Sequence, residues 1–222
     1  MKNTLWVDDY APKHIDDYLW YNKQQEVQVK SWVKRKDIPH LLLSGPPGTG
    51  KTSLIKMLKN ELNCNDFNFI DINGSKYREK DEILKRLGKK DGVENGVFFR
   101  GAFGGGYDKL IILIDECDQL KDAAFKYLRG EIEATQSYTR WCFTCNDDKS
   151  IPDAIKSRVH YMPFKKVSTK MFYAKMFDIL EKEKIDYTPK ILKAYSDHYY
   201  CDIRQCISQL QTNAIDGKLS QL

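Results

Sequence analysis

One glycine-rich segment limits the possible folds of this chain more than any other: Gly45-Pro46-Pro47-Gly48-Thr49-Gly50-Lys51-Thr52. Two glycines, a lysine and a hydroxyl residue at these spacings are the pattern of a phosphate-binding loop (P-loop). Residues 41–43 before it are apolar, as in a buried strand, and residues 53–58 after it are apolar at helical spacing. In such a strand–loop–helix unit, the backbone N–H groups of the loop and the N-terminus of the helix face one anion. The pattern therefore predicts a phosphate site rather than a turn that binds nothing, formed by Gly45, Pro46, Pro47, Gly48, Thr49, Gly50, Lys51, Thr52 and Ser53.

A second apolar run, residues 110–114, ends in two carboxylates, Asp115 and Glu116. Such a run is typical of a central parallel strand, and open α/β sheets bind ligands at the carboxyl ends of their strands. A P-loop together with this strand is typical of nucleoside triphosphatases. We therefore expect Thr52 and Asp115 to hold a magnesium ion and Lys51 to reach the terminal phosphates.

Glu116 and Asn146 are the candidates for positioning the attacking water. Glu116 directly follows the metal-side aspartate, which favours a role in hydrolysis over that of a surface carboxylate beyond a strand end. Asn146 follows another strand pattern, residues 140–145. We expect it to hold the same water or to contact the terminal phosphate, although an asparagine alone at such a place is an ordinary turn residue.

Strand and helix patterns alternate up to about residue 165, and only helix patterns follow. This order predicts an α/β domain, residues 1–165, with a parallel five-stranded sheet and flanking helices, and a small all-helical lid domain, residues 166–222. Residues 6–20 form an aromatic-rich arm that we expect to be irregular. Residues 91–108 are rich in glycine and too long for a simple connection, which indicates a functional or mobile loop. The predicted strands are residues 41–44, 67–71, 110–116, 140–145 and 160–164. The predicted helices of the first domain are residues 24–36, 51–62, 79–90 and 122–134 and a short helix that begins at Pro152. Three further helices, in the lid domain, begin at Ser168, Thr188-Pro189 and Asp202.

Charge and composition limit the possible partners and the cellular location of the protein. The formal net charge of +5, from 36 basic and 31 acidic residues, permits a nucleic-acid partner without requiring one. No apolar run approaches the ~20 residues of a membrane helix, and the N-terminus lacks the apolar core of a signal peptide, so we expect a cytosolic protein with no membrane partner. Cys142 and Cys145 form a C-x-x-C on a predicted buried strand, which favours core thiols over zinc or redox use.

Further motifs occur in a fixed order along the chain, and together they resemble the small subunits of clamp loaders in the AAA+ superfamily. The resemblance extends to eukaryotic and archaeal replication factor C and to the clamp loader of T-even bacteriophages. Many proteins share a P-loop, but few share this series. Besides the P-loop, the matching segments are Trp6–Pro12 (W-V-E-K-Y-R-P in the family), Asn73-Gly74-Ser75, Gly104–Lys109, Asp115-Glu116-Cys117-Asp118, Thr144-Cys145-Asn146 (sensor 1), Ser157-Arg158-Val159 (the S-R-C box) and Asp202–Gln205 (sensor 2).

The resemblance implies an ATPase that uses ATP and Mg²⁺ within an assembly. Val7, Tyr10 and Pro12 would cover the adenine, and Arg204 would contact phosphate in its own subunit. Arg158 would be a catalytic arginine finger that reaches the ATP of a neighbouring subunit, and an arginine supplied in this way contributes ~10³–10⁵ to the rate.

The partners implied are other clamp-loader subunits in a homo- or hetero-oligomeric spiral, a sliding clamp and primer-template DNA. The implied location is the cytoplasm or the nucleoid, or the host cytoplasm for a bacteriophage protein. The implied role is the opening of a clamp by ATP binding and its loading on DNA during DNA replication.

A basic cluster, Lys76, Arg78 and Lys80, is the candidate DNA contact. It lies at the start of a predicted helix, where backbone N–H groups also favour phosphate. Acidic residues alternate with it, so a solvated helix face is an equally good interpretation from sequence alone. In the family this region lines the channel for duplex DNA, which implies contacts to the DNA backbone without base reading.

The chain departs from the family pattern in several places. Two positions at which the family has arginine are Ala11 and Gly130 here, and the cysteine of the S-R-C box is replaced by Val159. The sequence also stops after the lid, whereas clamp loaders carry a third helical collar domain, which implies either a fragment or an assembly held together otherwise. Two alternative functions stay open: another AAA+ DNA-linked ATPase, such as a helicase loader or a branch-migration motor, and a nucleotide-binding scaffold that does not hydrolyse.

Overall fold

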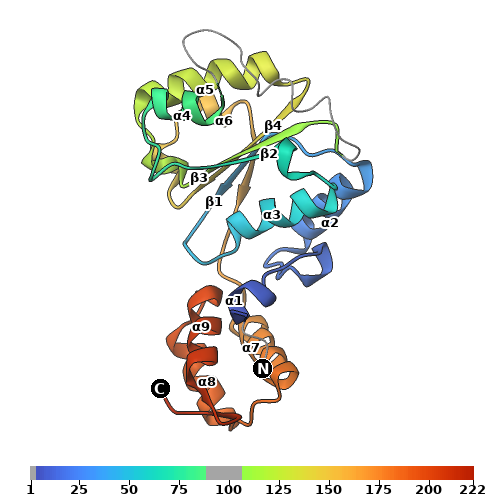
Figure 1. The fold of residues 1–222 in the computed structure, drawn as a ribbon, viewed down its shortest axis with the longest axis vertical. Coiled ribbons are helices and arrows are strands. Elements are labelled where there is room, and N and C mark those ends of the chain that lie inside the picture. The colour runs from blue at the N-terminus through green and yellow to red at the C-terminus, as the bar shows by residue number, and fades with distance from the viewer. Residues whose placement is uncertain (1–3, 89–106) are drawn as a thin grey trace.

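A computed structural model describes residues 4–88 and 107–222 of the chain. Its centre is one parallel sheet with the strand order β2-β3-β4-β1-β5 (Figure 1). The predicted parallel five-stranded sheet is therefore confirmed. The strands are β1 (Leu41–Ser44), β2 (Phe69–Asn73), β3 (Leu110–Asp115), β4 (Thr139–Cys145) and β5 (His160–Pro163).

Helices cover both faces of the sheet because side chains along each strand alternate between the two faces. On β1, Leu42 packs into one core, and Leu41 and Leu43 pack into the other. The Leu42 face is covered by α4 (Lys80–Arg86), α5 (Asp122–Thr135) and α6 (Asp153–Lys156), and the opposite face by α2 (Lys23–Arg35) and α3 (Lys51–Glu61).

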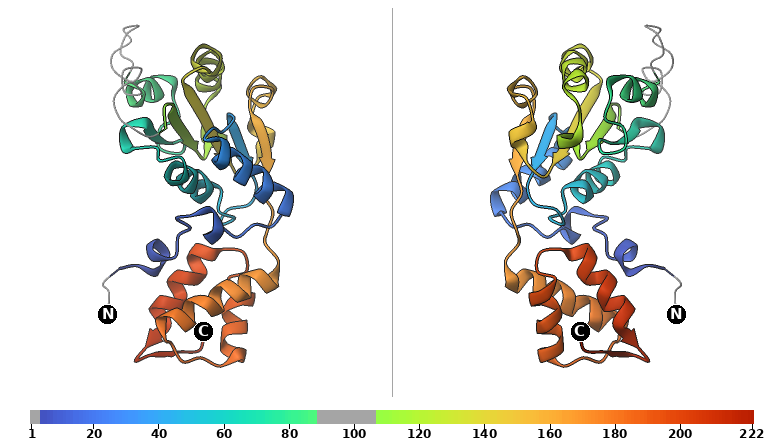
Figure 2. Two further views of the ribbon diagram at one scale, coloured as in Figure 1. Left: turned by 90° about the vertical axis from the view of Figure 1, so that its right-hand side faces the viewer. Right: turned by 90° about the vertical axis from the view of Figure 1, so that its left-hand side faces the viewer.

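A third core lies in the C-terminal part, separate from the two cores on the sheet. It is built by α7 (Thr169–Glu183), α8 (Pro189–His198) and α9 (Ile203–Asn213), which form a distinct body below the sheet (Figure 2). Ser168, Thr188 and Asp202 cap these helices by accepting hydrogen bonds from backbone N–H groups at 3.2, 3.3 and 2.9 Å, as predicted. We refer to this body as the lid.

The N-terminal arm contains more regular structure than its sequence indicates. Residues Trp6–Asp9 form a short helix, α1, and residues Ile15–Asp17 form a 3-10 turn. Side chains of α1 pack against the lid core, and the backbone N–H of Trp6 donates to Gln211 of α9 at 2.9 Å. The arm therefore connects the sheet domain to the lid.

Two local features differ from the sequence-based expectation. Strand β2 begins two residues later than predicted, because the Asn65 side chain accepts from the Asn68 N–H at 2.8 Å and turns residues Asp66–Asn68 into a 3-10 helix. After α9, β6 (Ala214–Ile215) and β7 (Lys218–Leu219) form a hairpin. Its turn residues Asp216 and Gly217 have φ of 49° and 75°, which is the conformation that an Asp-Gly hairpin turn favours. Of the predicted glycine-rich loop 91–108, residues 91–106 lie outside the described part of the chain.

The N-terminal edge of the sheet is held by a charged cluster around Asp37. Its carboxylate accepts hydrogen bonds from Arg140 at 3.0 Å, Lys109 at 2.6 Å and the Tyr107 hydroxyl at 2.9 Å. Burial acts to raise the pKa of Asp37, but these three donors outweigh it and hold the pKa well below its usual range. Beside this cluster, the Nδ1 atom of His40 accepts from the Trp141 N–H at 3.0 Å.

His40 makes the stability of the fold depend on pH. Burial and the nearby Arg140 lower the pKa of His40 from 6.5 to about 4. Well above pH 6.5 the ring is neutral in both the folded and the unfolded chain, and its contribution to stability is complete. As pH falls toward 4, only the unfolded chain takes up the proton, so stability is lost. We expect the free energy of unfolding, measured in urea, to fall between pH 7 and pH 4.5 in both proteins. The fall should be about 1 kcal/mol smaller in His40→Asn than in the wild type, after discounting for the partial exposure of His40.

The matched control for this measurement is His198→Asn, because His198 is exposed on α8. This variant should lose as much stability as the wild type between the two pH values. Equal losses in the wild type and in His40→Asn would show that His40 does not carry the dependence.

Candidate nucleotide-binding site

The P-loop, the end of β3 and the end of β4 meet at the carboxyl edge of the sheet. This follows from topology, because β3, β4 and β1 are neighbours and run parallel. The loop begins at Gly45, whose φ is 153° and where an added Cβ would lie 2.2 Å from the carbonyl oxygen of Phe164. Only glycine fits there, since the clash would be with backbone.

Lys51 is the buried cation of this site. The residue is only 8% exposed. Its Nζ donates to the carbonyl oxygens of Gly45 at 2.7 Å and Pro46 at 2.9 Å, and to Asn146 Oδ1 at 3.1 Å. Burial lowers the pKa of Lys51, and the neighbouring Cys145 and Asp115 act in the opposite direction. The geometry therefore brings the predicted Lys51 and Asn146 into direct contact.

Thr52 and Asp115 form the second half of the site. The Thr52 hydroxyl donates to Asp115 Oδ1 at 2.8 Å. The Thr144 hydroxyl donates to the same oxygen and accepts from the Glu116 N–H at 3.1 Å. From the sequence, Thr144 is named only as part of the sensor 1 segment and has no role of its own. The structure places it at the site, because the strand register pairs Ile114 with Phe143 and so sets Thr144 beside Asp115.

The donor atoms at this place fit magnesium. A hydroxyl and a carboxylate are hard oxygen ligands, and Mg²⁺ in nucleotide sites uses one or two carboxylates together with phosphate and water. Among residues 4–88 and 107–222, no cluster of three or more His, Cys, Asp or Glu residues with metal-binding geometry occurs. Thr52 and Asp115 are thus the residues that would hold the ion beside a bound triphosphate.

Glu116 follows β3 in an uncommon backbone conformation, with φ of 55° and ψ of 44°. Such a left-handed conformation at a non-glycine residue costs about 1 kcal/mol or more, and strained conformations of this kind cluster at functional sites. Its carboxylate makes no hydrogen bond or ion pair within the described part of the chain. The side chain is therefore available to a water molecule near Asp115.

The N-terminal arm reaches the P-loop through Tyr18, which the sequence analysis did not single out. The Tyr18 hydroxyl donates to the Gly50 carbonyl oxygen at 3.0 Å, and burial raises the pKa of Tyr18 well above its usual range. The predicted adenine-covering residues Val7 and Tyr10 pack against the lid core, where the Tyr10 hydroxyl donates to Glu183 at 2.7 Å. Pro12 lies in the arm between these contacts.

The lid contacts the P-loop directly at the start of α9. A Cβ added to Gly48 would lie 3.0 Å from the Cα of Asp202, the residue that caps α9. Arg204 is exposed in the first turn of this helix and makes no hydrogen bond or ion pair with the described residues. The structure thus brings the start of the predicted sensor 2 segment to the P-loop.

Arg158 lies at the N-terminal edge of the sheet, opposite to the carboxyl edge that carries the P-loop. It lies between α6 and β5, two residues before the first residue of β5, which pairs with Leu41 at the N-terminal end of β1. The four residues of β5 span about 13 Å, so Arg158 does not reach the P-loop of its own chain. Its guanidinium is partly exposed and forms an ion pair with Glu133, so Arg158 is not part of the core.

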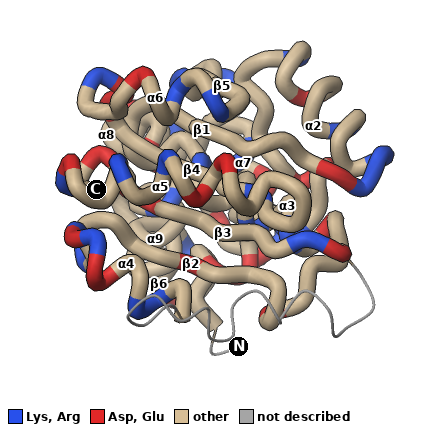
Figure 3. Tube along the Cα trace, turned by 90° about the horizontal axis from the view of Figure 1, so that it is seen from above, with Lys and Arg blue, Asp and Glu red and all other residues tan. Residues whose placement is uncertain are grey.

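The candidate DNA contacts lie on the segment between β2 and α4. Lys76 and Lys80 place their ammonium groups 5.4 Å from the Tyr77 ring centroid and 5.9 Å from that of Tyr127. Arg78 donates from Nε to the carbonyl oxygen of Gln119 at 2.9 Å. Basic and acidic residues are interspersed around α4 (Figure 3), as the sequence indicates.

Cys142 and Cys145 are buried free thiols on β4. Their side chains are therefore part of the packed interior, as the sequence analysis favoured.

Residues 41–167 match the ATPase family associated with various cellular activities (AAA). This match covers the P-loop, the ends of β3 and β4, and Arg158.

The chain belongs to the AAA family of ATPases.

Curated relatives of this AAA protein include two archaeal proteins named replication factor C small subunit. The one from Sulfurisphaera tokodaii is 32% identical over 222 residues, and the one from Archaeoglobus fulgidus is 34% identical over 220 residues. The alignments cover 99% and 97% of this chain and 65% of each relative. The AAA protein thus spans just under two thirds of the length of these relatives.

Solved structures agree on the fold of the AAA protein. The Thermotoga maritima RuvB Holliday junction branch migration motor has a TM-score of 0.70 and 16% sequence identity, and covers 92% of this chain and 64% of its own. At this identity the similarity shows the fold alone. None of the helices within residues 4–88 and 107–222 combines the length and apolar character needed to cross a membrane.

Proposed function

We propose that this AAA protein is an ATPase subunit of a DNA sliding-clamp loader. In this proposal, ATP binding assembles subunits that open a clamp, and the clamp is loaded on primer-template DNA during DNA replication. The observation that carries the proposal is the pair of contacts at the carboxyl edge of the sheet, Lys51 with Asn146 and Thr52 with Asp115. The similarity to replication factor C small subunits supports the clamp-loader assignment.

The chemistry follows from these contacts. Lys51 and the P-loop N–H groups would bind the terminal phosphates, and Thr52 and Asp115 would hold Mg²⁺, which supplies charge neutralisation on the phosphates when bound. Glu116 would accept a hydrogen bond from the attacking water, and Asn146 would keep that water or the terminal phosphate in line. Val7, Tyr10 and Pro12 of the arm would cover the adenine, and Arg204 would contact phosphate from the lid.

The place of Arg158 supports a role in an assembly. It lies at the edge of the sheet opposite to the P-loop, so a catalytic contact requires the ATP of another subunit. A head-to-tail arrangement in which the P-loop edge of one subunit faces the Arg158 edge of the next satisfies this requirement. The proposed partners are therefore other clamp-loader subunits, besides the clamp and DNA, in the cytoplasm or at the nucleoid.

Lys76, Arg78 and Lys80 are the proposed DNA contacts. The acidic neighbours Glu79 and Glu82 are engaged locally, since Glu79 pairs with Lys121 and Glu82 caps the start of α4. Lys76 and Lys80 form no ion pair with the described residues, and both are exposed. Arg78 contacts Gln119, three residues after Glu116, so bound DNA would act close to the proposed catalytic loop.

The double variant Lys76→Ala/Lys80→Ala is expected to weaken binding of primer-template DNA. Each lysine that contacts phosphate contributes about one unit to the slope of log affinity against log salt. The slope measured by fluorescence anisotropy on the assembled complex should therefore fall by about 2. Lys193→Ala, an exposed lysine on α8, should leave it unchanged. An unchanged slope in the double variant would place the DNA elsewhere.

Glu116→Gln tests the function itself. The amide cannot accept the proton of the attacking water, so ATP turnover by the assembled complex with DNA and clamp should fall about 100-fold or more. ATP affinity should stay within about twofold, because Glu116 is proposed to contact water rather than nucleotide. The matched control is Glu181→Gln, a carboxylate on α7. Unchanged turnover in Glu116→Gln would contradict the role of Glu116 in hydrolysis, and no turnover in either protein would instead support a scaffold that does not hydrolyse.

A further inference from the structure

The side chain of Arg158 is fully engaged within its own chain. Its Nε donates to Glu133 Oε1 at 2.7 Å, and its Nη2 donates to the same oxygen. Its Nη1 donates to the carbonyl oxygen of Ala154 at 2.6 Å and to the Ser157 hydroxyl at 3.1 Å. All three guanidinium nitrogens therefore have acceptors that a phosphate would have to replace.

Glu133 is placed to give up this contact. It lies in the last turn of α5, and its side chain is 57% exposed, against 30% for Arg158. Exposed ion pairs are weak because water screens both charges. A triphosphate carries several negative charges and several acceptor oxygens, so it competes well against a single exposed carboxylate.

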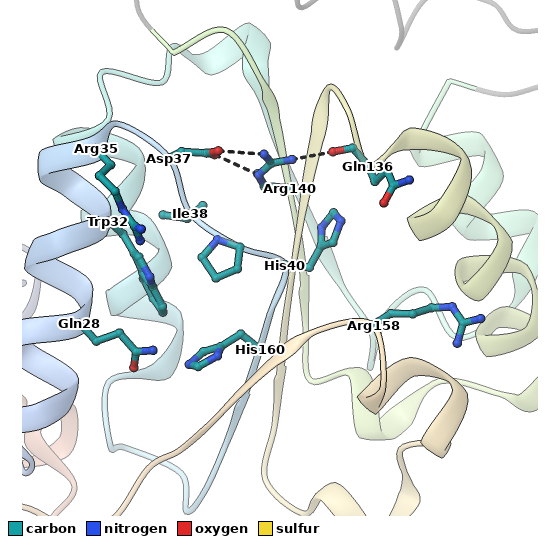
Figure 4. Close-up of a pocket in the computed structure, with 11 residues that line it drawn as sticks. Gln28, Trp32, Arg35, Asp37, Ile38, His40, Gln136, Arg140, Arg158 and His160 are labelled. Atoms are coloured by element: carbon teal, nitrogen blue, oxygen red, sulfur yellow. Dashed lines mark hydrogen bonds and ion pairs between the residues drawn. The ribbon is translucent and has the colours of Figure 1, made fainter.

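Arg158 also has room to move. It lines a cavity of about 660 Å³ at the N-terminal edge of the sheet, together with Arg35, Arg140 and His160. In Figure 4 the Arg158 guanidinium points away from the other lining side chains. Arg140 is fixed by Asp37, whereas Arg35 makes no ion pair or hydrogen bond within the described part of the chain. Of the three arginines, only Arg158 thus combines a contact that an anion can displace with the position expected of an arginine finger.

We propose that Glu133 is a positioning residue that holds Arg158 in a withdrawn conformation until the triphosphate of a neighbouring subunit displaces it. The inference rests on the proposed action of Arg158 in trans. When the interface between two subunits is loosely closed, Arg158 stays on Glu133 and ATP is hydrolysed slowly. When the interface closes tightly, Arg158 moves to the triphosphate of the neighbouring subunit. Glu133 thereby lowers ATP turnover in the absence of DNA and weakens ATP-dependent association of subunits.

Glu133→Gln tests this inference in the assembled complex. The amide keeps the size of the side chain and removes its charge, so the finger is released more often. Basal ATP turnover without DNA should rise about fivefold, the upper range for an exposed ion pair, while turnover at saturating DNA stays within about twofold of wild type. ATP-dependent subunit association, measured by sedimentation, should tighten by a similar factor. Glu133→Asp, which keeps the charge, should behave more like wild type than Glu133→Gln.

The matched control is Asp197→Asn, which makes the same change of charge at an exposed position on α8. A role of Glu133 in stability alone would lower turnover or leave it unchanged, and would not raise it. An unchanged or lower basal rate, or unchanged association, in Glu133→Gln would overturn the inference. Full DNA-stimulated turnover in Arg158→Ala would instead overturn the proposed action of Arg158 in trans, on which the inference rests.

Discussion

Arg158→Ala is expected to lower DNA-stimulated ATP turnover by the assembled complex about 10³-fold, the lower range for an arginine finger supplied by a neighbour. The reason is geometric, since Arg158 precedes β5 at the edge of the sheet opposite to its own P-loop. The affinity of each subunit for ATP should stay within about twofold of wild type, because the nucleotide contacts of that subunit are intact. Turnover is measured by phosphate release and affinity by calorimetry.

Arg35→Ala is the matched control for this variant. Arg35 lines the same cavity as Arg158 and has the same charge, but it lies on α2 and is given no role in hydrolysis. It should keep most of the stimulated turnover. Retained turnover in Arg158→Ala, or equal losses in both variants, would reject a specific catalytic role for Arg158.

Lys51→Ala is expected to lower the affinity for ATP by about 10- to 100-fold. The ammonium group is buried at the P-loop, where a charge-assisted hydrogen bond contributes about 1.5–3 kcal/mol and no water replaces it fully. Calorimetric titration of the chain with ATP and Mg²⁺ measures the loss. Lys56→Ala, an exposed lysine on the same helix, should bind as wild type does. Wild-type affinity in Lys51→Ala would place the nucleotide outside the P-loop.

The sequence predicts the parallel sheet, and it predicts that the P-loop, Asp115 and Asn146 lie close together, because both features depend on local patterns. The glycines of the P-loop determine its backbone conformation, and the lysine that follows determines its positive charge, so both are set within a few residues. Parallel strands then bring their carboxyl ends together, so Asp115 and Asn146 could be assigned to the site from their places after apolar runs. The AAA family match covers this same stretch.

Features that depend on long-range packing could not be predicted in the same way. Tyr18 contacts Gly50, and Glu133 pairs with Arg158, and in each case the partner lies far along the chain with no pattern to connect the two. The predicted start of β2 is wrong because the apolar run that indicates a strand begins at Phe67, whereas the Asn65 cap turns residues Asp66–Asn68 into a 3-10 helix. The β6–β7 hairpin has an Asp-Gly turn, but its strands are only two residues each, too short for an alternation to be visible.

The most direct test of the account is a mixture of the two inactive variants in one assembly. A Lys51→Ala subunit still carries Arg158, and an Arg158→Ala subunit still binds ATP. In an equal mixture of head-to-tail subunits, about a quarter of the interfaces then combine an intact ATP site with an intact arginine. DNA-stimulated turnover should therefore return to about a quarter of the wild-type value per subunit. A mixture no more active than the two variants measured separately would contradict the action of Arg158 on a neighbour's ATP.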